Sequence, residues 1–319
     1  MWRAVGLGLA FSLVAAAGLA KPYRPPTTAW GAPDLGGIWT SASYTRLERP
    51  PRFKTLIIPP QEASAYEASL KDSHGMPKPP PGADVVGQFD SEYFEAGDGL
   101  TRIDGQARSS WIVDPANGRL PYRPEARLRF NIGRPDPPEA FDGPEARPAF
   151  ERCMTSTGSA PPLLAGNDAN LYEIVQTPDF VAIEAEKGHE VRIIPLGGAP
   201  VPNAPPASSG NAAGHWEGDT LVVETEGFRD PVIDRGPFLY QSGSARITER
   251  FTRISQTEVL YQFEVADPAV FTQTWRGETV FKTAKGPLYE YACHEGNRSI
   301  VNILAAARRA ERSSQTTGG

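Results

Sequence analysis

The sequence predicts a mainly β protein, in which an antiparallel meander closes into a lipocalin-like barrel or a strongly curved sheet. Three observations favour this fold class. Runs rich in β-branched and aromatic residues follow one another through the second half of the 319-residue chain. Turn residues separate these runs at hairpin spacing. An amphipathic helical stretch follows the last run. No period of about 20 to 50 residues repeats, which disfavours a propeller or a solenoid.

The composition restricts the classes of protein that the chain can belong to. It contains 32 Lys and Arg residues against 38 Asp and Glu residues, a formal net charge of −6. An acidic balance argues against a protein that binds the phosphate backbone of nucleic acids. The 31 Gly and 32 Pro residues predict many turns and long loops. We therefore expect a globular protein with no nucleic-acid partner.

Residues 1–20 have the pattern of a cleaved signal peptide. Arg3 supplies a positive charge, an apolar run extends from Ala4 to Ala17, and the segment ends with the small residue Ala20. An uncleaved membrane anchor is the alternative, but the apolar run is short for a membrane span. We expect export to the periplasm or secretion, and a mature chain that does not span the membrane.

The N-terminal half is predicted to be long and irregular. Residues 21–35 are rich in proline and should form an extended arm. A single mainly β domain should then cover residues 36–312 and begin with a short strand around Trp39. The further elements expected in this half are a helix over 61–71, a loop over 75–105, a strand over 110–113 and irregular structure over 123–160.

The second half should hold the clearest meander, over residues 170–296. Its expected strands are 171–176, 180–184, 191–194, 220–225, 247–254, 259–265, 272–281 and 288–292. A loop over 197–213 is long enough to be a lid or a binding loop. A closing amphipathic helix is expected over 299–311, packed on the sheet, and a disordered tail over 313–319.

Cys153 and Cys293 are the only two cysteines of the chain. In an oxidising compartment, a pair that lies far apart in sequence is most simply one disulfide. This bond would tie the middle of the chain to its last strand. The alternative is that Cys293 is a free nucleophile beside His294, which an oxidising compartment disfavours.

Four strings of residues are distinctive. They are PDLGGIW (33–39), GHWEGDTLVV (214–223), ERF (249–251) and YEYACHEGN (289–297). Together they resemble a family of exported bacterial proteins that has no assigned reaction, and the resemblance covers most of the mature chain. The Gly37-Ile38-Trp39 string also resembles the Gly-x-Trp opening of lipocalins. That likeness is architectural and implies an apolar ligand cavity only by analogy.

The candidate catalytic residues are His215, His294, Glu217 and Glu249. A histidine beside a carboxylate is the usual general base, because its pKa lies near neutrality and the carboxylate orients it. On a strand, His215 and Glu217 would share one face. The alternative is that Glu217 belongs to a hairpin turn and that the histidines make structural hydrogen bonds.

The candidate ligand-binding residues are Trp216, Arg253, Glu295 and Tyr291. Strand aromatics such as Trp216 could line a cavity, although large aromatics on strands usually belong to the core. Arg253 and Glu249 could orient a ligand, or they could belong to a solvated strand face.

No cofactor is predicted, and the alternative is zinc. His189, His215 and His294 would supply three imidazole ligands and leave the fourth position open. None of the short histidine spacings that mark metal motifs is present, so a metal site is not the favoured hypothesis.

These observations predict an exported protein with a small-molecule site in the mouth of a β-barrel. The leading hypothesis is a cofactor-independent lyase, isomerase or hydrolase that uses His and carboxylate groups for acid–base chemistry. The alternative is a non-catalytic periplasmic binder of an apolar small molecule or of an envelope partner. The sequence indicates neither the substrate nor the oligomeric state.

Overall fold

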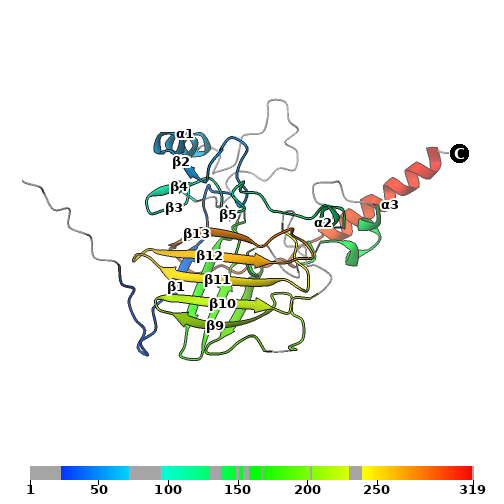
Figure 1. The fold of residues 1–319 in the computed structure, drawn as a ribbon. Helices are drawn as coiled ribbons and strands as arrows, with labels where there is room; N and C mark the ends of the chain where they lie inside the picture. Colours follow the sequence, from blue (N-terminus) through cyan, green and yellow to red (C-terminus); the bar gives the residue numbers. More distant parts are fainter. Residues whose placement is uncertain are drawn as a thin grey trace, which may run out of the picture.

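The computed structural model describes residues 23–71, 95, 97–129, 138–148, 151–153, 158–166, 168–201, 203–229 and 239–317. Within them, nine antiparallel strands form a nearly closed barrel (Figure 1). In sheet order these strands are β8 (Glu190–Pro195), β7 (Phe180–Ala185), β6 (Leu171–Gln176), β1 (Gly37–Thr40), β13 (Trp275–Thr283), β12 (Glu258–Ala266), β11 (Arg246–Arg253), β10 (Thr220–Glu226) and β9 (Asn211–Glu217). The predicted fold class is confirmed. The predicted signal peptide lies outside the described residues.

The barrel closes where the chain after β8 approaches β9. Leu196 and Gly214 form a parallel bridge, and the N–H of Gly197 donates to the carbonyl of Gly214 at 2.9 Å. A Cβ on Gly214 would lie only 2.9 Å from Cγ2 of Ile194. Glycine at this position therefore allows the two edges to approach each other.

Strand alternation determines what faces the interior. In β11, Ile247, Glu249 and Phe251 are buried, whereas the residues between them are only partly buried. β9 begins at Asn211, within the segment 197–213 that was expected to be a loop, so the sequence prediction did not include this strand. The strand expected over 288–292 is wrong, since these residues have no regular structure. The segment 211–214 lacks an apolar alternation, whereas Tyr289 and Tyr291 flank Glu290 as they would on a strand, which explains the two errors.

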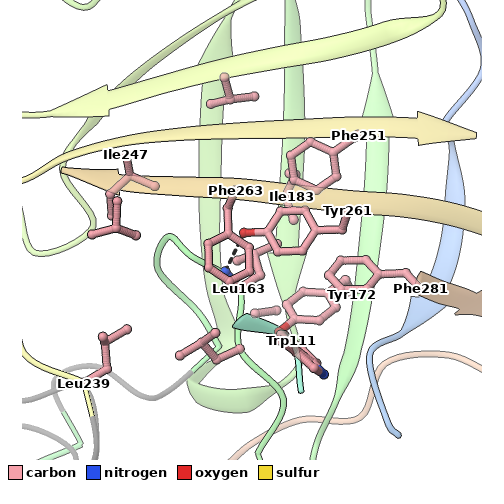
Figure 2. Close-up of a cluster of buried hydrophobic side chains, with 14 of the residues drawn as sticks. Trp111, Leu163, Tyr172, Ile183, Leu239, Ile247, Phe251, Tyr261, Phe263 and Phe281 are labelled. Atoms are coloured by element: carbon pink, nitrogen blue, oxygen red, sulfur yellow. Dashed lines mark hydrogen bonds between the residues drawn. The ribbon is translucent and has the colours of Figure 1, made fainter. Parts of the chain in front are cut away.

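Aromatic side chains fill much of the barrel interior (Figure 2). The ring of Tyr261 lies 4.9 Å from that of Phe251 and 4.9 Å from that of Phe281, measured between centroids. Phe263 packs edge-on against Trp275 at 5.4 Å. The segment 158–164 is also buried, and the N–H of Leu163 donates to the Tyr261 hydroxyl. These strand aromatics therefore belong to the core.

A smaller unit packs on the barrel beside β13 (Figure 1). It contains α1 (Pro60–Lys71) and a sheet of β2 (Ile57–Ile58), β4 (Gln106–Arg108) and β3 (Arg102–Ile103). Its own apolar cluster includes Phe53, Tyr66 and Leu70. An ion pair at 3.1 Å between Arg108 and Glu278 joins it to the barrel. The predicted helix over 61–71 is confirmed. The predicted strand over 110–113 corresponds to β5 (Ile112–Asp114), which pairs with β13.

After β13, residues 284–298, here called the C-terminal strap, lead into α3 (Ser299–Thr317). α3 projects from the barrel (Figure 1), and Arg308 donates to the carbonyl of Phe141 at 2.9 Å. Phe141 ends the 3₁₀ helix η2 (Pro138–Phe141), and Arg308 also donates to the carbonyl of Asp142, so α3 contacts η2 and the residue after it, whereas packing on the sheet was expected. α3 also continues beyond residue 311, into the predicted tail. The other short helices are α2 (Pro124–Arg129), η3 (Pro144–Ala146) and η4 (Lys187–His189).

Candidate functional site

His215 and Glu217 lie on the outer face of the barrel, on β9. Nε2 of His215 is 3.2 Å from Oε1 of Glu217, and Nη1 of Arg250 donates to Oε2 of Glu217 at 2.8 Å. All three side chains are between 41% and 49% exposed. Hydrogen bonds from Arg250 and then from His215 lower the pKa of Glu217. The two predicted residues therefore meet, as strand alternation requires, on a solvated surface.

Glu249 faces the opposite side of the sheet from this cluster, because Arg250, the next residue of β11, is on the outer face. The Glu249 side chain is fully buried and pairs with Arg192 of β8 at 2.5 Å. The Tyr261 hydroxyl donates to Oε1 of Glu249 at 2.8 Å. The structure thus separates Glu249 from His215 and places it in an internal polar network.

Both oxygens of Glu249 are partnered in this internal network, whereas Nε of Arg192 is buried and makes no hydrogen bond with the described residues. Burial lowers the pKa of Arg192, but the nearby Glu249 carboxylate outweighs this effect, so that the pKa is raised overall. Burial, and then the charge of Glu249, raise the pKa of Tyr261. Arg192 therefore stays charged and Tyr261 stays neutral across the physiological range. Sequence reasoning missed Arg192.

Arg253 and Trp216 both have structural contacts. Cζ of Arg253 lies over the ring of Trp39, 5.3 Å from the ring centroid. Nη1 of Arg253 donates to the carbonyl of Asp34 at 2.9 Å. Trp216 is partly buried and packs against the barrel core. Arg253 thus joins the end of β11 to the segment that precedes β1.

The remaining candidates lie on the C-terminal strap. The disulfide between Cys153 and Cys293, with a Cα–Cα distance of 5.8 Å, holds the strap to the middle of the chain, so the predicted bond is present in the structure. Nζ of Lys187 lies over the ring of Tyr291, 6.0 Å from the ring centroid. His294 and Glu295 are exposed. Among the described residues, no interaction joins His294 to His215.

The residues proposed for zinc do not come together. His189 lies 3.5 Å from Glu184, whereas His215 contacts Glu217. In the part of the chain that the structure describes, no group of three or more His, Cys, Asp or Glu side chains could hold a metal ion.

A groove of about 570 Å³ opens at the end of the barrel where β6 begins and β7 ends. We call it the mouth groove. The chain from β1 to α1 contributes Thr40, Ala42, Tyr44 and Lys71. The other lining residues are Glu95, Gly97, Leu171, Glu186, Lys285 and Tyr289. The groove therefore gathers two lysines, two carboxyl groups and two tyrosine rings from segments that are far apart in sequence.

Glu186 is the most buried charged residue of the mouth groove, with 5% of its surface exposed. Its Oε1 accepts the backbone N–H of Tyr289 at 3.1 Å. Its Oε2 is shielded from solvent and has no hydrogen-bond partner among the described residues. Buried polar atoms are normally partnered, so an orphan oxygen requires an explanation. No sequence pattern singled out Glu186, because it comes directly after β7 and outside the strand alternation.

The comparisons with known proteins add no further evidence. The chain gives no match to a protein-family model, to a curated protein or to a solved structure. The resemblance to a family of exported bacterial proteins therefore stays a prediction. Among the helices in the described segments, none combines the length and apolarity needed to cross a bilayer.

Proposed function

We propose that the chain is an exported binding protein for a small molecule, with its site in the mouth groove. One observation carries the proposal: the groove contains a buried carboxyl group, Glu186, and the described part of the chain partners only one of its two oxygens. The groove volume is within the range of about 300–1,000 Å³ that small-molecule sites occupy. The aromatic side chains that might have lined a cavity inside the barrel belong instead to its core.

Export to the periplasm is part of this proposal. It rests on the signal-peptide pattern of residues 1–20. The Cys153–Cys293 disulfide supports it, because such bonds persist in oxidising compartments.

Binding is better supported than acid–base catalysis by the histidines. His215 has its carboxylate partner on the outer face of the barrel, and His294 is exposed on the C-terminal strap. Neither is among the residues that line the mouth groove. Catalysis nevertheless remains an outcome that the same experiment detects, because a converted ligand would be recovered in a different chemical form.

The test is a ligand screen by thermal shift, followed by titration of each hit. Leu171→Trp should fill the mouth groove and abolish binding. Val175→Trp is the matched control, because Val175 lies on the same strand and is exposed on the outer face. Tyr289→Ala is a second groove variant that should fold normally, since the Tyr289 side chain is 69% exposed. Hits that bind both groove variants as tightly as the wild type would overturn the proposal.

A further inference from the structure

We propose that the ligand of the mouth groove is a small zwitterion, whose protonated amine donates to Glu186 and whose acidic group faces Lys71 and Lys285. This inference rests on the proposed function and specifies the class of ligand.

Oε2 of Glu186 is a buried polar atom of the mouth groove with no partner in the described segments. A carboxylate is an acceptor only, so Oε2 of Glu186 needs a donor. The described protein residues supply none. A protonated amine is the donor that suits it best, because hydrogen bonds between two charged groups are the stronger kind. The buried carboxyl thus selects for a ligand with an amine.

A ligand must be able to reach Oε2 of Glu186 from the mouth groove. Oε2 is closed off from bulk water, and Tyr289 lies beside it on the C-terminal strap. Only the backbone N–H of Tyr289 is bonded to Glu186, and its side chain is mostly exposed. The ring can therefore change its rotamer while that backbone bond stays intact. It can also cover the bound amine, since an aromatic face attracts a cation.

The two lysines that line the mouth groove are Lys71 and Lys285. Lys187 and Lys282 pair with Asp168 and Asp98 respectively. Lys71 and Lys285 also line the mouth groove, but neither forms a salt bridge with a described residue. They would repel a ligand that carries only positive charge, and they match an acidic group.

A ligand with only one charge fits the mouth groove less well. A simple anion would meet the lysines but would leave Oε2 of Glu186 without a donor. A simple amine would satisfy Glu186 but would leave Lys71 and Lys285, which form no salt bridge with a described residue, with only Glu95 as a further carboxyl group of the groove. A zwitterion satisfies both ends of the site, as an amino acid, an ω-amino acid or a short peptide would.

The experiment uses probes that share a carbon skeleton. For chain lengths of about four to eight carbons, ω-amino acids are compared by calorimetry with the corresponding alkylamines, fatty acids and alcohols. We expect the wild-type protein to bind at least one ω-amino acid about tenfold more tightly than its amine or acid counterpart. An acid or an alcohol that binds as tightly as the zwitterion would overturn the inference, and this ranking requires no variant.

The variants assign each charge to its partner. Glu186→Gln should weaken the zwitterion and the amine by about tenfold and leave the acid unchanged. The double variant Lys71→Gln/Lys285→Gln should weaken the zwitterion and the acid and leave the amine unchanged. Glu184→Gln is the control, because Glu184 is two residues away on β7 and contacts His189. Unchanged zwitterion binding in Glu186→Gln would contradict the assignment.

The two proposals fail in different ways. If other compounds bind and Leu171→Trp blocks them, but no zwitterion binds, the mouth groove remains a ligand site and only the ligand class is wrong. If the hits bind equally to Leu171→Trp and Tyr289→Ala, the proposed function is wrong and the inference falls with it.

Discussion

Glu249 and Glu186 are both buried carboxyl groups, but they differ in how fully the described residues partner their two oxygens. In the barrel interior, Glu249 receives two guanidinium contacts from Arg192 and one hydroxyl from Tyr261. In the mouth groove, Glu186 receives one backbone N–H, and its other oxygen makes no hydrogen bond within the part of the chain that the structure describes. The comparison distinguishes a carboxyl group used for structure from one available to a ligand.

The reason for the difference is geometric. β11 and β8 point Glu249 and Arg192 toward each other across the barrel, and both side chains are buried there. Glu186 lies beyond the end of β7, where the next layer is the C-terminal strap and not another strand. A carboxyl group with one unpartnered oxygen can be tolerated there, because a ligand, or a water molecule that a ligand displaces, can complete its hydrogen bonds.

The largest effect is expected from breaking the internal pair. Glu249→Leu should lower the free energy of unfolding by about 3–5 kcal/mol, because it leaves the buried charge of Arg192 without compensation. The double variant Arg192→Met/Glu249→Leu should recover most of this loss, since neither charge then remains. Urea denaturation of both variants measures the difference. A loss below about 1 kcal/mol in the single variant would show that the pair is not structurally important.

The next effect should come from the disulfide that holds the C-terminal strap. Cys153→Ser/Cys293→Ser should lower the free energy of unfolding by about 2–4 kcal/mol, because the bond joins residues separated by 140 positions and restricts the unfolded chain. Urea denaturation measures this loss. The wild-type protein in reducing agent is the control and should lose a similar amount. Equal stability of the oxidised wild type and the double-serine variant would contradict the expectation.

The sequence predicted the barrel because most strands carry their own pattern. β10 to β13 alternate or concentrate apolar residues, and each is bounded by turn residues. β9 was missed because Asn211, Ala212, Ala213 and Gly214 have low strand propensity. β9 forms because β10 offers it a complementary edge, which is a tertiary effect.

The candidate site was harder to predict than the fold. In β8, Val191 and Ile193 face outward, 51% and 55% exposed, while Arg192 faces inward. Apolar patterning alone would assign the opposite orientation. Ile194, fully buried and paired with Val181, fixes the register, and Arg192 then meets Glu249. The mouth groove could not be predicted, because its residues come from separate segments that only the folded chain brings together.

A much smaller effect should follow from changing the carboxyl of the mouth groove. Glu186→Gln should alter the free energy of unfolding by less than about 1 kcal/mol, because the amide oxygen can still accept the N–H of Tyr289 and the amide nitrogen replaces an oxygen that makes no hydrogen bond with the described residues. Urea denaturation beside Glu249→Leu makes the comparison direct. A loss as large as that of Glu249→Leu would mean that Glu186 is a structural group after all.

The smallest effect should belong to the exposed cluster of His215, Glu217 and Arg250. The pKa of Glu217 is lowered by Arg250 and then by His215, so the fold favours the carboxylate form. Its contribution to stability is therefore present above the unfolded pKa of about 4.3 and is lost as the pH falls through the lower folded pKa. Solvent screens these contacts, so the pKa itself is the better measurement. In NMR titrations, Arg250→Gln should raise the pKa of Glu217 toward its ordinary value, and His215→Gln should raise it by less. A larger change in His215→Gln would reverse this order and make the histidine the main partner of Glu217, as a general-base pair would require.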